Sequence, residues 1–76
     1  MRFWSVNYKG HTIRVESRVF EFRLIVDGEL QDAAIRMWQL TGVIRSGAGA
    51  GEAIKASLVG GFSVRCYIFV DHKLVQ

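Results

Sequence analysis

The stretch LIVDGELQD at residues 24–32 returns in similar form as IFVDHKLVQ at residues 68–76. Asp71 follows Asp27 by 44 residues, so the two stretches align as the end of a strand, an Asp-X turn and a short returning strand. An Asp side chain accepts backbone N–H bonds in such turns, and Gly28 tolerates the left-handed backbone that they need. The sequence therefore predicts two similar halves, each built around one of these turns.

Alternating apolar and polar residues surround both turns, as expected for half-buried strands. Lys9-Gly10 and Gly60-Gly61 are expected to form hairpin turns, and a turn near residues 17–19 accounts for a change in parity before Phe20. The residues predicted to face inward are Trp4, Val6, Tyr8, Ile13, Val15, Phe20, Phe22, Leu24 and Val26, then Ile54, Ala56, Leu58, Phe62, Val64, Cys66, Ile68 and Val70. Two such apolar faces are best buried against each other. We predict an all-β fold, a small antiparallel β-sandwich of about 7–8 strands in one domain over residues 1–76.

Residues 32–41 leave an alternative open. Apolar side chains in ELQDAAIRMWQLTG recur at helical spacing, with Asp32 as a possible N-cap and Gly42 at the C-terminal stop. The same residues alternate poorly as a strand. Periodicity alone therefore favours an α+β fold with one short helix around residues 32–41.

The order of motifs along the chain resembles the Fas apoptosis inhibitory molecule family. Domains of that family carry a V-D-G turn and then a W-M-F-K-L-V-G-like segment that ends in Gly fourteen residues later. Here MWQLTG at residues 37–42 is similar to that segment, and Gly42 follows Gly28 by 14 residues. Gly61-Phe62, an alternating strand and VDHK at residues 70–73 resemble the end of the family's domain. The likeness covers nearly the whole chain.

This resemblance implies a β-sandwich in which the Met-aromatic segment is extended rather than helical. It also implies a non-enzymatic protein, since the family is implicated in resistance to receptor-triggered cell death. Two departures stand out: family members carry two such domains whereas this chain has one, and His72 replaces the usual turn Gly. The fold is therefore expected to carry over more readily than the cellular role.

Few residues suggest catalysis or metal binding. His11 and His72 are the only two histidines, too few for a metal site of three or four ligands, and we interpret them as exposed turn residues. Cys66 alternates onto the inner face, where a thiol behaves as a small hydrophobic side chain. The glycine-rich residues 47–52 lack the Lys-Ser/Thr of a phosphate loop, which favours a flexible linker between the halves. We expect no catalytic residue, no cofactor and no metal.

Charge and cysteine content narrow the class of protein. The net charge is +3, from ten Lys and Arg against seven Asp and Glu spread along the chain, which is too little to indicate nucleic-acid binding by itself. A single Cys suits a reducing compartment. The first ten residues lack the apolar run of a signal peptide, and no apolar stretch approaches the roughly 20 residues of a membrane helix. We expect a soluble, cytoplasmic protein that does not enter the membrane.

Apolar residues at outward positions suggest an interface. The candidate residues are Arg23, Ile25, Val59, Arg65, Tyr67 and Phe69. Aromatic side chains beside Arg are typical of interface hot spots, although the middle segment or a terminus could instead cover them. We predict a non-enzymatic protein-interaction module that binds a protein partner or a second copy through a sheet face or an exposed edge strand. The alternative is a weak nucleic-acid-binding domain that uses Arg and aromatic residues on a sheet face, with Tyr67 and Phe69 as stacking platforms beside Arg14, Arg18, Arg23 and Arg65.

Overall fold

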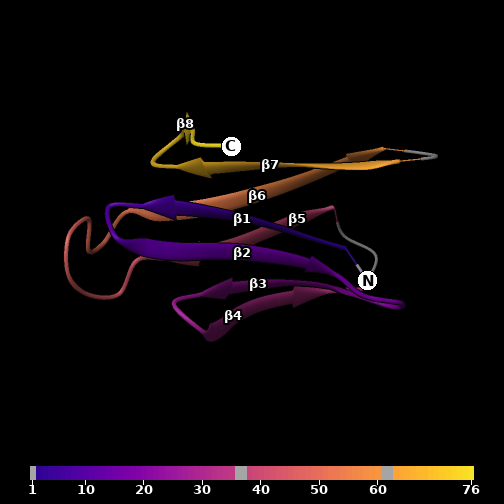
Figure 1. The fold of residues 1–76 in the computed structure, drawn as a ribbon, viewed down its shortest axis with the longest axis horizontal. Helices are drawn as coiled ribbons and strands as arrows, with labels where there is room; N and C mark the ends of the chain where they lie inside the picture. Colours follow the sequence, from indigo (N-terminus) through magenta and orange to yellow (C-terminus); the bar gives the residue numbers. More distant parts are fainter. Residues whose placement is uncertain (1, 36–37, 61–62) are drawn as a thin grey trace.

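The computed structural model describes residues 2–35, 38–60 and 63–76, and these ranges form eight strands in two sheets (Figure 1). The strands are β1 (Arg2–Tyr8), β2 (His11–Ser17), β3 (Phe22–Val26), β4 (Glu29–Ala34), β5 (Gln39–Val43), β6 (Ala53–Gly60), β7 (Val64–Val70) and β8 (Lys73–Leu74). Both sheets are antiparallel and follow chain order, β1-β2-β3-β4 and β5-β6-β7-β8. The predicted all-β fold of two similar halves is confirmed.

The alternative helix around residues 32–41 is wrong for the described residues. β4 runs to Ala34 and β5 begins at Gln39, while residues 36–37 lie outside the described part of the chain. The apolar side chains that produced the helical spacing have different environments. Leu30, Ala33 and Trp38 are exposed, Ala34 is partly buried against the core, and Met37 lies outside the described residues. No single apolar face exists for a helix to bury.

Three two-residue turns set the hairpin registers. They are Lys9-Gly10, Asp27-Gly28 and Asp71-His72, and all six residues have positive φ, between 49° and 84°. Positive φ at both central residues defines the type I′ turn, whose twist matches that of the flanking strands. His72 adopts this conformation at φ 67°, which Gly would adopt at less cost. The predicted Gly60-Gly61 turn differs, because Gly60 pairs with Val64 as the last residue of β6, and Gly61 lies outside the described residues.

The two repeated aspartates make equivalent bonds in the two halves. Asp27 exchanges two bonds with Thr12: its backbone N–H donates to the Thr12 carbonyl at 2.9 Å, and its Oδ1 accepts from the Thr12 N–H at 2.9 Å. Asp71 makes the equivalent two bonds with Ala53: its N–H donates to the Ala53 carbonyl at 2.9 Å, and its Oδ1 accepts from the Ala53 N–H at 3.1 Å. Each carboxylate therefore accepts a backbone N–H of the neighbouring strand, one residue past the point where the regular strand pairing ends.

The inner faces of both sheets form one core. Its buried residues are Ile13, Val15, Leu24, Val26, Leu40, Ile44, Ile54, Ala56, Leu58, Cys66, Ile68 and Val70, with Trp4, Val6, Tyr8, Phe22 and Val64 partly buried against them. The alternation placed its strand residues correctly apart from Phe20, but it did not identify Leu40 and Ile44, which are also buried; Phe62 lies outside the described residues. Phe20 is exposed, because β3 begins only at Phe22 and Phe20 lies in the preceding turn.

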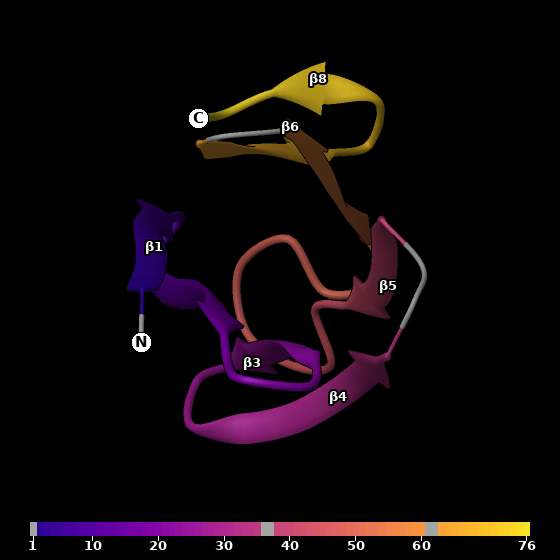
Figure 2. The ribbon, with the colours of Figure 1, turned by 90° about the vertical axis from the view of Figure 1, so that its right-hand side faces the viewer.

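Side chains of β4 join the two sheets along one side of the sandwich. The Gln31 amide forms two bonds with the backbone of Val43 in β5: Val43 N–H donates to Oε1 at 2.7 Å, and Nε2 donates to the Val43 carbonyl at 2.8 Å. The Thr41 N–H donates to Asp32 Oδ2 at 2.9 Å. Figure 2 shows β4 beside β5 on this side, with β1 at the opposite margin.

Candidate functional site

Four of the six predicted interface residues lie together on the outer face of the second sheet. We call Val59, Arg65, Tyr67 and Phe69 the β6–β7 face. Val59 pairs with Arg65 across the two strands, and Phe69 pairs with Lys55. Val59 and Tyr67 are exposed, and Phe69 is half-buried beside a hollow that Lys55 and His72 also line. The face combines aromatic, aliphatic and basic side chains.

Arg23 and Ile25 lie on the other sheet, in β3, so the structure does not unite the six candidates. β3 and β7 are equivalent in the repeat, and their outer faces therefore point away from each other. Both side chains are half-buried. Arg23 pairs with Glu21, and Ile25 lies between Arg14 and Leu30 of the adjacent strands.

A more exposed apolar surface lies where the sequence did not indicate one. We call Val19, Phe20, Ile35 and Trp38 the apolar end; their exposed fractions are 88%, 81%, 71% and 48%. Val19 and Phe20 form the corners of a turn closed by a 2.8 Å bond from Arg18 N–H to the Glu21 carbonyl. Turn corners are usually Gly, Pro, Asn, Asp or Ser. Two large apolar residues there need an explanation.

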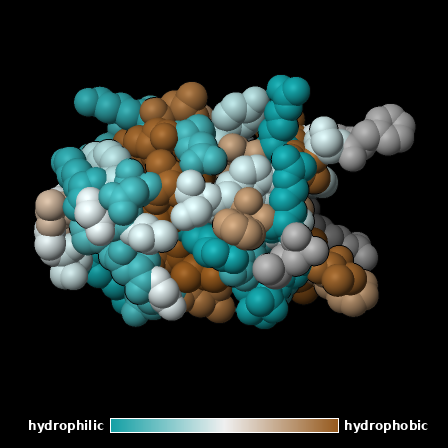
Figure 3. All heavy atoms as spheres, viewed as in Figure 1, coloured by the Kyte–Doolittle hydropathy of each residue, from teal (hydrophilic) through white to brown (hydrophobic). Residues whose placement is uncertain are grey.

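The second half of the apolar end comes from the link between the sheets. Ile35 borders, with Val19 and Phe20, a hollow of about 320 Å³. Trp38 packs on Phe22, with ring centroids 5.6 Å apart. Hydrophobic side chains gather at the right of Figure 3, the end at which Figure 1 places the β2–β3 turn. In the sequence, the one sign of this surface was the apolar pair Val19-Phe20 between two charged residues, and the alternation had placed Phe20 in a strand.

Arginines neutralise the acids next to the apolar end. Glu16 is buried, and its oxygens accept from Arg14 Nε at 2.9 Å and Arg18 Nε at 3.2 Å. Burial raises the pKa of Glu16, but the bonds from Arg18 and Arg14 outweigh it and lower the pKa. Glu21 pairs with Arg23 in the same way. The apolar end therefore carries no uncompensated acid among its described neighbours on β2 and β3.

His11 is the most constrained polar side chain, contrary to its interpretation as an exposed turn residue. Its side chain is 12% exposed, Nδ1 lies 2.6 Å from Asp27 Oδ2, and Nε2 lies 2.7 Å from the Ala48 carbonyl oxygen. Both partners are acceptors, so only the imidazolium can donate to both. The bond to Asp27, followed by that to Ala48, raises the pKa of His11, and the same bond lowers the pKa of Asp27.

The glycine-rich residues 47–52 are docked rather than a linker between halves. They connect β5 to β6 within the second half, and Ile44 bonds to both Gly51 and Glu52 across the loop base. Tyr8 Oη donates to Glu52 Oε1 at 2.8 Å, and Lys9 Nζ lies 3.1 Å from Oε2. These two bonds lower the pKa of Glu52. With His11, they tie the loop to the first sheet.

The Asp27–His11 pair has the arrangement of two members of a Ser-His-Asp triad, yet it lacks a free base. In a triad Nε2 takes the proton of the nucleophile. Here Nε2 is engaged by the Ala48 carbonyl. Cys66 is buried, which raises its pKa to about 11, so it remains a thiol at neutral pH. Neither group is prepared for catalysis in this arrangement.

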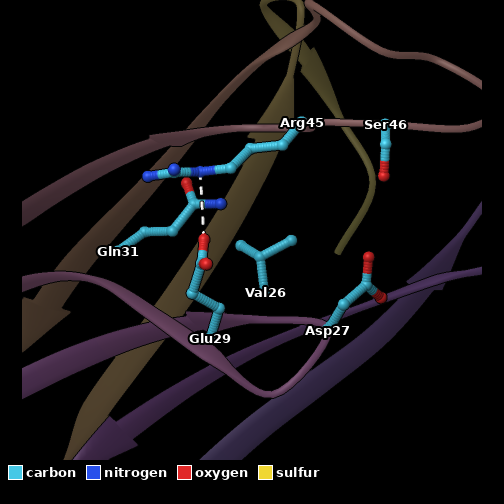
Figure 4. Close-up of a pocket in the computed structure, with 6 residues that line it drawn as sticks. All are labelled: Val26, Asp27, Glu29, Gln31, Arg45 and Ser46. Atoms are coloured by element: carbon cyan, nitrogen blue, oxygen red, sulfur yellow. Dashed lines mark ion pairs between the residues drawn. The ribbon is translucent and has the colours of Figure 1, made fainter.

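A polar pocket of about 170 Å³ lies where the Asp27-Gly28 turn meets the segment after β5. Figure 4 shows its lining of Val26, Asp27, Glu29, Gln31, Arg45 and Ser46. Arg45 Nε pairs with Glu29 Oε1 at 3.0 Å, Gln31 is held by Val43, and Asp27 is held by His11. Its polar groups mostly satisfy one another, so the pocket offers little to a ligand.

Within the described ranges, no group of three or more His, Cys, Asp or Glu residues is placed to hold a metal ion. Nor does the described part of the chain include a helix of the length and apolar character required to cross a membrane.

Comparisons of the chain with models of protein families, with curated proteins and with solved structures found no match. The resemblance to the Fas apoptosis inhibitory molecule family therefore stays a prediction, and the function must be argued from the surfaces described above.

The His11 contacts predict a stability that depends on pH. Because the pKa of His11 is raised in the folded state, its contribution is fully present below its ordinary pKa of about 6.5 and is lost as pH rises through the folded-state pKa. We expect Tm to fall as pH rises from about 6.5 through the raised pKa of His11 in the folded state. In thermal unfolding experiments, the Tm of His11→Gln should not show this decrease with pH. His72→Gln is the control, since the His72 ring makes no hydrogen bond within the described residues; equal slopes in wild type and His11→Gln would contradict the account.

Proposed function

We propose that this chain is a non-enzymatic protein-interaction module that binds a partner protein through the apolar end. The observation that carries the proposal is the exposure of Val19 and Phe20 at the corners of one turn, beside Ile35 and Trp38 from a separate link. The four side chains offer on the order of a few hundred Å², the size at which exposed apolar patches on monomers often mark binding sites. Folding alone gives no reason to place them there.

The charges around the apolar end specify the partner's surface. Arg14 and Arg18 share Glu16, and Arg23 pairs with Glu21, so these three arginines keep one excess positive charge beside the β2–β3 turn. A partner that offers an apolar pocket with an acidic rim would bury Phe20 and meet these guanidinium groups. Trp and Arg are both enriched among the residues that dominate binding energy.

The remaining features support a binding role. The Cys66 thiol is buried with a pKa of about 11, and the His11 imidazole is used in structural contacts. A single buried thiol suits a reducing compartment, and we place the protein in the cytoplasm. The family resemblance points the same way, toward a module without catalytic residues.

Phe20→Asp tests the proposal. Proteins captured from source cells by wild-type chain would be purified and titrated against wild type, Phe20→Asp and the control Val59→Asp, which changes an exposed Val on the other sheet. We expect Phe20→Asp to weaken binding more than about tenfold, which is about 1.4 kcal/mol. Its fold should be unchanged, because Phe20 lies outside the core. Equal affinity of all three proteins for every captured partner would refute the proposal.

One observation favours a second candidate, nucleic-acid binding through the β6–β7 face. Arg65 and Lys55 accompany Tyr67 and Phe69 there, and the outward positions of β6 and β7 carry no acid. Aromatic rings between cations are typical platforms for single strands. Titration of single-stranded oligonucleotides at low salt would show binding that weakens steeply as salt rises, and Tyr67→Ala should abolish it. No binding at low salt ends this candidate.

A further inference from the structure

Of the four sheet edges in the described chain, two are joined to each other, one is very short, and β1 is the one long edge left open. The edges of β4 and β5 face each other and are joined by Gln31 and Asp32. The β8 edge is short, because this strand has only two residues. β1 pairs with β2 over all seven of its residues without a register shift, and it contains no Pro and no Lys. Long regular edges of this kind are usually blunted, because they pair with other strands.

The hydrogen bonds of Thr12 show which groups β1 directs outward. The N–H and C=O of Thr12 both bond to Asp27, on the β3 side of β2. In an antiparallel pair, the two backbone groups of a residue point to the same side, so Asn7 and Thr12 form a non-hydrogen-bonded pair. The N–H and C=O of Asn7 therefore point away from β2. By alternation, those of Ser5 and Phe3 do so too.

The second half of the repeat supplies the comparison. Ala53 bonds to Asp71 as Thr12 bonds to Asp27, and Val43 opposite Ala53 corresponds to Asn7. In β5 the outward groups of Val43 are satisfied by Gln31, and the Thr41 N–H by Asp32. Within the described residues, the equivalent groups of Ser5 and Asn7 have no such partner. The fold closes this edge in one half and leaves it open in the other.

We propose that β1 pairs antiparallel with β1 of a second copy of the chain, about a two-fold axis at Ser5. This register places Ser5 opposite Ser5 and Phe3 opposite Asn7, and so uses all three outward-facing residues in about six backbone hydrogen bonds. Trp4 meets Val6 on the inner face, and Arg2 meets Tyr8, so no like charges are opposed. β1 lies at the margin opposite the β4–β5 junction (Figure 2). The β1-β2-β3-β4 sheets of the two copies would then form one sheet of eight strands.

This self-pairing rests on the proposed role as a binding module, but it uses a different surface. A second copy is favoured over an unrelated strand because β1 is complementary to itself in this register. The exposed Phe3 ring, which the Arg14 guanidinium covers at 3.9 Å, would gain Asn7 of the second copy as a neighbour. A short strand contact of this kind predicts a weak, concentration-dependent dimer rather than a permanent one.

In the proposed dimer Ser5 lies opposite Ser5 of the second copy, and the test uses this symmetry. Sedimentation of wild type from about 10 µM to about 1 mM should show the mean mass rising toward twice that of the monomer. Ser5→Lys and Ser5→Glu should each raise the dissociation constant more than tenfold, because like charges then face each other across the axis. An equimolar mixture of the two should associate again. Ser5→Pro should also dissociate the dimer while leaving the fold intact, because the Ser5 N–H is not used by β2.

Two controls separate this inference from the proposed function. Thr41→Lys changes the counterpart of Ser5 in β5, where the edge is closed, and should leave the dimer unaffected. Phe20→Asp should leave it unaffected as well. A mass independent of concentration, or a dimer lost with Phe20→Asp but kept with Ser5→Lys, would overturn the edge pairing. The second result would leave binding through the apolar end in place.

Discussion

Leu24→Ala should lower the free energy of unfolding by about 3 kcal/mol, within the range of about 2–5 kcal/mol for buried Leu. Leu24 is fully buried in β3 and packs near Gly42 of the opposite sheet. A chain of 76 residues has roughly 4–11 kcal/mol in all, at about 0.05–0.15 kcal/mol per residue. The substitution therefore removes a large share of the total stability, and denaturant unfolding at constant pH will measure it.

Leu30→Ala is the matched control for this prediction. Leu30 is the same residue type on the next strand, but its side chain is exposed on the outer face. Its loss should change the free energy of unfolding by less than about 0.5 kcal/mol. If the two variants were equally destabilised, the inner face of the first sheet would have been assigned wrongly.

Gly42→Ala should cost about 2 kcal/mol through the junction between the sheets. A Cβ at position 42 would lie 3.0 Å from Leu24 Cδ2 and much closer still to Gln31 Oε1. The Gln31 amide would have to move, and it would lose both bonds to Val43, each worth about 0.5–1.5 kcal/mol. The close approach of Gln31 thus explains why a Gly ends the MWQLTG segment.

A double-mutant cycle isolates this effect. In Gln31→Ala the amide is absent, so adding Gly42→Ala should cost at least about 1 kcal/mol less than it does in wild type. Denaturant unfolding of the four proteins gives the coupling directly. Strictly additive effects would mean that Gln31 does not occupy the space beside Gly42.

Local pattern predicted the strands and the inward residues, because alternation depends only on neighbours in the chain. It failed at Phe20, where the turn extends to Glu21 and the apolar residue that continues the alternation is outside the strand. It failed again at residues 32–41, where apolar residues of two strands and a link imitate a helical period. In both places the backbone path, which residue order does not reveal, determined exposure.

Contacts between distant residues were beyond sequence reasoning. His11 meets Asp27 and Ala48, and Gln31 meets Val43, only because the sheets bring their turns and edges together. The six predicted interface residues are divided between two faces, since Arg23 and Tyr67 occupy equivalent places in opposite sheets. The repeat makes the two halves comparable: the edge of β5 is closed by Gln31 and Asp32, whereas the equivalent edge of β1 is open.

Amide hydrogen exchange followed by NMR at low and high protein concentration tests the central claim, that two similar sheets share one core and leave β1 open. We expect slow exchange at all concentrations for core-strand amides such as Ile68, and for Thr41 and Val43, whose N–H groups are held by Asp32 and Gln31. Ser5 and Asn7 should exchange fast in dilute solution and slowly in concentrated solution. Fast exchange at Thr41 and Val43, or protection of Ser5 in the dilute monomer, would contradict it.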